Sequence, residues 1–106
     1  MSFNDITTEE ALKKELAEHE SAVVVFGAYW SNMSTLTKQT FQKNMSKYSS
    51  TYFVWIDIDE APQLQKAYTV ESIPTALGYK GNSQVHRFVG PMAIDSQIDD
   101  FVKKTL

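Results

Sequence analysis

Two unbroken apolar runs dominate the hydrophobic pattern of the chain. The first, "SAVVVFGAY", begins at residue 21, and the second, "TYFVWIDID", begins at residue 51. Unbroken runs rich in β-branched and aromatic residues are typical of central strands that other elements cover on both faces. The pattern therefore predicts two buried strands near the middle of a sheet.

Apolar residues at helical spacing precede and follow the first of these runs. The segment "TTEE" at residues 7 to 10 fits a capping box with Thr7 as the cap, and its helix is expected to reach about Glu20. A second helix is predicted over residues 34–49. Its expected inward-facing residues recur at roughly helical spacing: Leu36, Phe41, Met45 and Tyr48.

A third, shorter helix is predicted in "DEAPQLQKAY". Pro62 suits its first turn, and Asp59 or Glu60 is expected near its N-terminal cap, where a carboxylate favours the helix dipole. The residues expected to face inward are Leu64, Ala67 and Tyr68.

The last part of the chain predicts a hairpin and a helix. "TALGYKGNSQVHRFVG" consists of two short strand-like runs joined by a turn around Gly81 and Asn82. A final helix is expected over residues 94–105, and residues 3–6 are expected to add a short edge strand. Alternation of strands and helices without linkers predicts one domain, residues 1–106, of the α/β class, with helices on both faces of a mixed sheet.

Composition and charge exclude several classes of function. The chain has 106 residues and a net charge of −3, and it carries no basic stripe of the kind that binds nucleic acid. No apolar run approaches the roughly 20 residues that span a bilayer. The start "MSFNDITTEE" lacks the basic and apolar parts of a signal peptide, so we expect a cytoplasmic monomer with no membrane or nucleic-acid partner.

Cysteine is absent from the sequence. Disulfide frameworks, thiolate metal sites and thiol catalysis are therefore impossible for this chain. The acidic cluster Asp57, Asp59 and Glu60 lacks the regular oxygen spacing and glycine turn of a calcium loop, and we expect neither a metal nor a cofactor.

Three short stretches carry a family resemblance: "VVVFGAYWSNMS", "ESIPTA" and "RFVGPM". Together with the order of elements, they resemble the thioredoxin family over nearly the whole chain. The resemblance implies a thioredoxin fold with a cis peptide bond between Ile73 and Pro74, before the C-terminal hairpin. The implied family activity is protein-disulfide reduction.

The positions that match the two redox cysteines of the family are Ser31 and Ser34. In the family, the first cysteine at a helix N-terminus attacks a client disulfide as a thiolate, and the second resolves the mixed disulfide. A hydroxyl has a far higher pKa than a thiol and forms no disulfide. No catalytic residue is therefore assigned in this chain.

Other departures from the family affect the same region. Val25 matches a buried acid that accepts a proton in many relatives, and Trp55 matches a lysine near that acid. Gly27 stands where the family usually has tryptophan, and its small size is expected to leave room for Trp55. Gln39 replaces the proline that kinks the long helix of the family.

Binding of a peptide remains possible without thiols. The resemblance implies a groove in which the backbone of Ile73 pairs with an extended segment of a client or partner protein. Ser31 is expected to cap a helix rather than act as a nucleophile, because neither His19 nor His86 is expected to lie near it. The implied groove residues are Trp30, Met33, Ile73, Pro74, Gly90, Pro91 and Met92.

Three interpretations of function stay open at this point. The first is a redox-inactive, thioredoxin-like module that binds or regulates a partner. The second is a thiol-disulfide oxidoreductase whose cysteines have been replaced by Ser31 and Ser34. Natural divergence explains the serines under the first interpretation, and deliberate replacement explains them under the second. The third is a scaffold domain within a larger assembly.

Overall fold

The computed structural model describes residues 2–106 and contains one mixed five-stranded sheet. Its spatial order is β1-β3-β2-β4-β5, in which β1, β3 and β2 run parallel and β4 and β5 are antiparallel to their neighbours. The strands are β1 Asn4–Asp5, β2 Ser21–Gly27, β3 Thr51–Asp57, β4 Thr75–Lys80 and β5 Ser83–Val89. The predicted edge strand, both central strands and the hairpin are confirmed.

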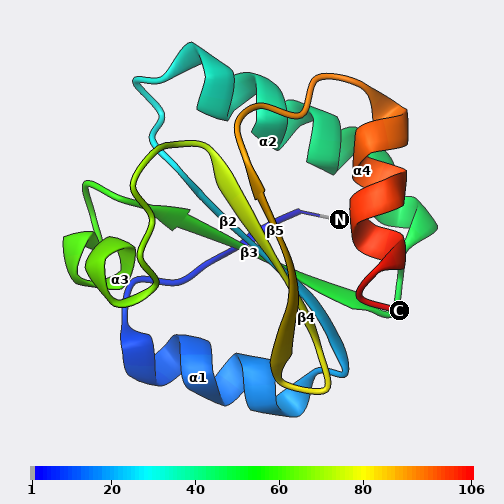
Figure 1. Cartoon of the computed structure of the whole chain (residues 1–106), viewed down its shortest axis with the longest axis horizontal. Coiled ribbons are helices and arrows are strands. Elements are labelled where there is room, and N and C mark those ends of the chain that lie inside the picture. The colour runs from blue at the N-terminus through cyan, green and yellow to red at the C-terminus, as the bar shows by residue number, and fades with distance from the viewer. Residues whose placement is uncertain (1) are drawn as a thin grey trace.

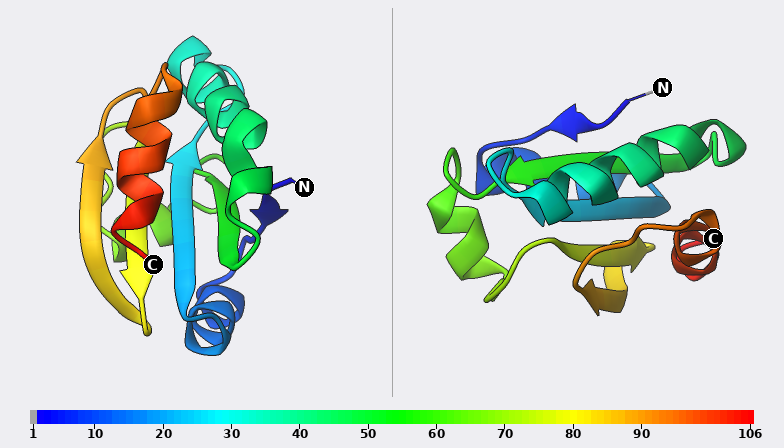
Figure 2. Two further views of the ribbon diagram at one scale, coloured as in Figure 1. Left: turned by 90° about the vertical axis from the view of Figure 1, so that its right-hand side faces the viewer. Right: turned by 90° about the horizontal axis from the view of Figure 1, so that it is seen from above.

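Helices cover both faces of this sheet (Figures 1 and 2). In Figure 1, α1 lies below the sheet and α2 above it, with α3 on the left and α4 on the right. The helices are α1 Glu9–Glu18, α2 Asn32–Asn44, α3 Pro62–Ala67 and α4 Asp95–Lys103, and a short 3-10 helix, η1 Met45–Lys47, continues α2. No helix in residues 2–106 has the length and apolar character needed to cross a membrane.

Strand β2 separates two apolar cores, because successive side chains of a strand point to opposite faces. Val24 and Phe26 pack in the core that α1 and α3 close with Leu12, Leu16 and Leu64. The intervening Val23 and Val25 pack in the core that α2 and α4 close; its other members include Phe41, Met45, Ile98 and Phe101. Every residue of β2 is buried, as its unbroken apolar run predicts.

The predicted ends of α1 are wrong by one or two residues. The cap is Thr8, whose hydroxyl accepts a hydrogen bond from the Ala11 N–H at 3.2 Å, and the helix ends at Glu18. Thr7 and Thr8 are adjacent and both have a hydroxyl that can cap a helix, so the sequence alone does not show which of them is the cap. The intrahelical ion pairs Lys13–Glu9 and Lys14–Glu18 lie on its solvent-exposed side.

The inward face of α2 is more polar than its apolar spacing predicts. Leu36 is exposed, whereas Thr37 and Asn44 are buried beside Phe41. Thr37 is inward because its hydroxyl accepts the backbone N–H of Met92 at 3.0 Å. The helix therefore uses polar side chains to hold the segment that leads into α4.

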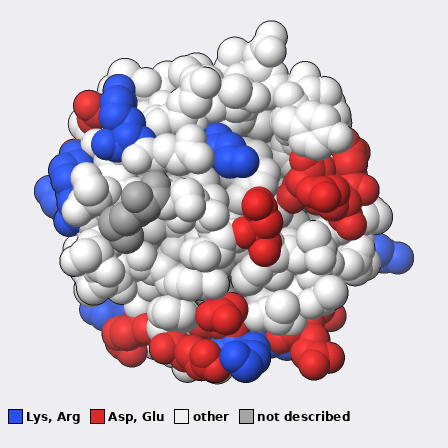
Figure 3. Space-filling model, turned by 180° about the vertical axis from the view of Figure 1, so that it is seen from behind, with Lys and Arg blue, Asp and Glu red and all other residues white. Residues whose placement is uncertain are grey.

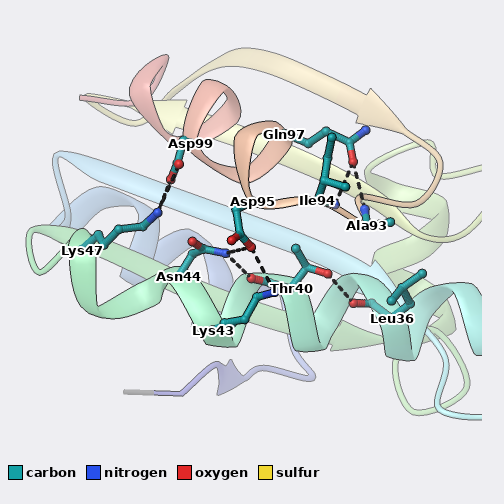
Figure 4. Close-up of polar contacts among 10 residues, drawn as sticks. All are labelled: Leu36, Thr40, Lys43, Asn44, Lys47, Ala93, Ile94, Asp95, Gln97 and Asp99. Atoms are coloured by element: carbon teal, nitrogen blue, oxygen red, sulfur yellow. Dashed lines mark hydrogen bonds and ion pairs between the residues drawn. The ribbon is translucent and has the colours of Figure 1, made fainter.

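Helix α4 is fastened to α2 and η1 by amide and charge contacts (Figure 4). The buried Asn44 side chain donates to the Asp95 carboxylate at 3.0 Å, and Lys43 lies 3.2 Å from the same oxygen. Lys47 pairs with Asp99 at 2.9 Å. These hydrogen bonds hold the pKa values of both aspartates below the ordinary range. The contacts fix α4 over the core that Val25 enters.

Gly27 and Trp55 share one volume in that core. A Cβ added to Gly27 would lie 2.6 Å from two ring atoms of Trp55, which is closer than non-bonded carbons approach. The expectation that Gly27 leaves room for Trp55 is confirmed. Val25 and Trp55 are register partners on β2 and β3 and both are buried, so an apolar contact occupies the place of the family's charged pair.

Candidate functional site

Four loops emerge at one edge of the sheet because of strand register. Gly27, at the end of β2, is paired with Asp57, at the end of β3. Thr75, at the start of β4, is paired with Phe26 on one side and Val89 on the other. Binding sites in α/β sheets form beyond the carboxyl ends of such parallel strands. The loops after β2, β3 and β5, and the loop before β4, therefore form the candidate site.

Ser31 is the N-terminal cap of α2. Its backbone is extended, and its hydroxyl accepts a hydrogen bond from the Ser34 N–H at 3.2 Å. Its carbonyl accepts the first helical bond, from the Thr35 N–H at 3.0 Å. The predicted capping role is confirmed: the hydroxyl satisfies one of the amide groups that a thiolate faces in the family.

Ser34 differs from Ser31 in that it is completely buried. Its Oγ has no hydrogen-bond partner among residues 2–106. Its Cβ would be 3.0 Å from a Cβ on Gly27, which places the residue against the end of β2. A buried hydroxyl without a partner is costly, so this position suits a less polar group better than the one it holds.

Trp30 and Met33 form an exposed apolar surface at the start of α2, with side chains 64% and 49% exposed. The Trp30 indole N–H donates to the Asp59 carboxylate at 2.6 Å. This bond fixes the ring while leaving most of it open to contact. A tryptophan held in one orientation at the surface loses little conformational freedom when it binds a partner.

Asp59 and Glu60 lie next to the N-terminal cap of α3, as predicted, but neither of them is the cap. The cap residue is Ala61, which has no side-chain bond to the helix, although Pro62 begins the helix as predicted. Asp57 instead organises the turn by accepting the Asp59 N–H at 2.8 Å. That leaves the Asp59 carboxylate for Trp30, a role that sequence reasoning missed because the two residues lie 29 positions apart.

The Ile73–Pro74 peptide bond is cis. Pro74 is buried, and its carbonyl accepts the Gly90 N–H at 2.9 Å, which joins two of the predicted groove segments. Gly90 has φ of +115°, a conformation that favours glycine. Pro91 is exposed beside it.

Met92 does not line the predicted groove. It is 1% exposed and belongs to the core between α2 and the sheet, where its N–H is fixed by Thr37. Loop 90–92 is thereby tied to α2 on one side and to Pro74 on the other. The structure places Trp30, Met33, Ile73 and Pro91 at the same end of the sheet, whereas Met92 is buried in the core.

The two histidines lie away from the serines. His19 follows α1, stacks on Tyr52 and contacts Glu15, and His86 on β5 lies against Phe101. Neither is hydrogen-bonded to Ser31, so neither histidine is placed to act as the base of a serine nucleophile. Within residues 2–106, no group of three acidic or histidine side chains is placed to hold a metal.

Comparisons with known proteins agree with this geometry. Residues 4–104 match the family model described as Thioredoxin. The chain is 31% identical to a thioredoxin of Ophiophagus hannah over 94 residues, which cover 87% of this chain and 88% of that protein. It is 33% identical to Thioredoxin-2 of Saccharomyces cerevisiae over 95 residues, covering 80% and 91% of the two chains.

Two further comparisons are more limited. Thioredoxin H5 of Oryza sativa is 35% identical over 78 residues, but the match covers 73% of this chain and only 58% of the rice protein. The crystal structure of mitochondrial thioredoxin 3 from S. cerevisiae superposes with a TM-score of 0.86 at 21% identity, over 95% of this chain and 93% of that one. The chain belongs to the thioredoxin family, with serines at the positions that match its redox cysteines.

Proposed function

We propose that the protein is a non-catalytic thioredoxin-like module that holds an extended segment of a partner protein at the site around Trp30. The observation that carries the proposal is the exposed, fixed indole of Trp30 beside Met33, directly before a helix whose cap is a hydroxyl. Exposed tryptophan and methionine are typical of protein-binding surfaces. Ser31, which caps α2, has a hydroxyl in place of a thiol and therefore performs no disulfide chemistry.

The backbone of Ile73 supports this mode of binding. Among residues 2–106, neither its N–H nor its carbonyl forms a backbone hydrogen bond, and strand β4 begins two residues later at Thr75. Free backbone groups next to a strand allow an extended peptide to add to the sheet. In this mode, the partner's backbone pairs with Ile73 and its apolar side chains contact Trp30 and Met33.

The test is selection of binders from a library of extended peptides, followed by affinity measurement with variants. We expect Trp30→Ala to weaken the selected peptides at least tenfold, as truncation of a central aromatic residue typically does. Val85→Ala removes an exposed apolar side chain from β5, away from this edge, and should leave binding unchanged. Equal affinity of the wild type and the Trp30 variant would refute the proposal.

A second function is favoured by the unpartnered hydroxyl of Ser34. A thiol is a weaker hydrogen-bonding group, so a cysteine would fit this buried position better. That fit supports a thiol-disulfide oxidoreductase whose cysteines have been replaced by serine. A scaffold role in an assembly and a cytoplasmic location remain predictions.

Restoring both cysteines separates the two functions. Under the non-catalytic proposal, the double variant Ser31→Cys and Ser34→Cys reduces insulin only slowly with a thioredoxin reductase, since Val25 and Trp55 offer neither proton acceptor nor ammonium group. Turnover comparable to that of an active thioredoxin measured in parallel would instead support the replaced oxidoreductase.

A further inference from the structure

A hollow of about 300 Å³ lies beside the Trp30 surface. It opens at the same edge of the sheet, between the loop after β2, the end of β3 and the segment that contains β1. Its size is at the lower limit for ligand sites, which suits one long side chain better than a separate cofactor. Its lining residues are Asp5, Thr7, Tyr29, Thr35, Lys38, Trp55, Asp57 and Glu60.

Carboxylates dominate the charge of the hollow. Three of its lining residues, Asp5, Asp57 and Glu60, are acidic, against the single base Lys38. Figure 3 shows the face crossed by β1, where acidic side chains gather at the centre and to the right of it. The neighbouring Asp59, which holds Trp30, adds a further negative charge next to the hollow.

Asp57 has a free acceptor although it is nine-tenths buried. The residue is 5% exposed and lines the hollow. Its Oδ1 accepts the Asp59 N–H, but its Oδ2 forms neither a hydrogen bond nor an ion pair with residues 2–106. A buried carboxylate normally has a cationic or hydrogen-bonding partner for each oxygen. This oxygen is open to the hollow, where it can accept a hydrogen bond from water or from a donor that enters the hollow.

The wall of the hollow already holds one cation. The ammonium of Lys38 lies 4.7 Å from the centroid of the Trp55 ring, within the range of a cation–π contact. Lys38 has no carboxylate partner among residues 2–106. Trp55 is only 5% exposed, so a second cation reaches this ring face by displacing the ammonium of Lys38, which is carried on a flexible stem.

We propose that this hollow receives a lysine or arginine side chain of the partner segment, and that the module therefore selects basic extended peptides. The inference rests on the proposed function, because the basic side chain enters from a peptide that lies on Trp30. Tyr29 lines the hollow and precedes Trp30 directly, so one peptide reaches both places. The carboxylates of Asp57 and Glu60 pair with the incoming cation while Trp55 contacts its stem.

Matched peptides test this selectivity. Three peptides share the same extended apolar core. The first is flanked on both sides by pairs of lysines, the second by pairs of glutamines and the third by pairs of glutamates. Their affinities for the protein are measured by titration. We expect the lysine peptide to bind roughly tenfold more tightly than the glutamine peptide, from one cation–π contact and one partly buried charge pair. The glutamate peptide should bind most weakly.

Two pairs of variants separate the hollow from overall charge. Glu60→Gln should reduce the preference for the lysine peptide about threefold. Glu20 precedes β2 at the opposite end of the sheet, so Glu20→Gln changes the net charge equally but should leave the preference unchanged. Lys38→Gln should strengthen binding of the lysine peptide about threefold by vacating the Trp55 face. Lys80→Gln, in the distant hairpin, is its control.

The outcomes distinguish the inference from the proposed function. If Trp30→Ala leaves all three peptides unaffected, the proposed function fails, and the inference fails with it. If Trp30→Ala weakens all three, but lysine and glutamine peptides bind equally, only the inference is overturned. A lysine preference that changes equally in Glu60→Gln and Glu20→Gln reflects net charge alone and also overturns it.

Discussion

Ser31 and Ser34 are predicted to respond in opposite directions to the same substitution. Ser31 is the N-terminal cap of α2, and Ser34 lies three positions later in its first turn. The Ser31 hydroxyl accepts the Ser34 N–H, whereas the Ser34 hydroxyl is completely buried and has no partner among residues 2–106. Replacement by alanine therefore removes a helix cap in one case and an unsatisfied polar atom in the other.

The magnitudes follow from these two environments. Loss of a serine cap typically lowers the free energy of unfolding by about 1 kcal/mol. A buried polar group without a partner costs roughly 1–3 kcal/mol, and alanine favours the helix by a few tenths more, so Ser34→Ala should raise the free energy of unfolding by about 1 kcal/mol. For a chain of this size, 1 kcal/mol shifts the melting temperature by roughly 4 °C.

Urea unfolding followed by far-UV circular dichroism measures both variants against the wild type. We expect the midpoint to fall for Ser31→Ala and to rise for Ser34→Ala, with the slope unchanged. Ser34→Cys should also raise the midpoint, because a thiol is less costly to bury than a hydroxyl. A loss of 1 kcal/mol or more in Ser34→Ala would show that its hydroxyl is satisfied in solution and would refute the reasoning.

Three other predictions concern the core and the titratable groups. Gly27→Ala should lower the free energy of unfolding by about 1–3 kcal/mol through its clash with Trp55, and adding Trp55→Phe should recover part of that loss in urea titrations. Burial raises the pKa of Tyr79 to about 12, so the unfolded state loses its phenol proton at lower pH than the folded state does. The free energy of unfolding should therefore decrease between about pH 10 and 12. Tyr79→Phe should make the melting temperature depend less on pH in this range. Burial, and to a smaller extent Lys104, lower the pKa of His86 below 6.5. As the pH falls, the unfolded state therefore takes up a proton before the folded state does, and the free energy of unfolding should decrease below about pH 6.5. His86→Gln should make this decrease with pH smaller.

The sheet could be predicted from the sequence because its signals are local. The unbroken run that became β2 has every residue buried, and the Gly81–Asn82 turn has positive φ at both residues, as its composition indicates. The last helix buries Ile98 as predicted. In each case, periodicity or turn chemistry within a few residues is sufficient.

The errors occur where a distant partner decides a local role. Leu36 fits an apolar helical spacing, but it is exposed because Thr37 faces inward to bind the Met92 N–H. Met92 is buried by the same contact, so its predicted place in the groove is wrong. Asp59 is expected to stabilise the N-terminus of α3, but in the fold its carboxylate accepts the Trp30 indole N–H instead.

The candidate site could be predicted only in its outline. The family resemblance identifies Trp30 and the Ile73–Pro74 segment, and the register of the strands places both at one edge. The hollow beside them depends on the position of Lys38 over Trp55, a contact between α2 and β3 in the wall of the hollow. No spacing in the sequence encodes such a contact.

The shared volume of Gly27 and Trp55 also constrains the order in which this chain can have departed from a family-like ancestor. A large residue at position 27 and an indole at position 55 are mutually exclusive, since even one carbon added to Gly27 meets the ring at 2.6 Å. Shrinkage at position 27 must therefore have come before, or together with, arrival of the indole. A larger residue at position 27 is therefore blocked for as long as the indole is present, whereas replacement of Trp55 by a smaller side chain meets no such barrier, so any return to the family pattern must begin at position 55.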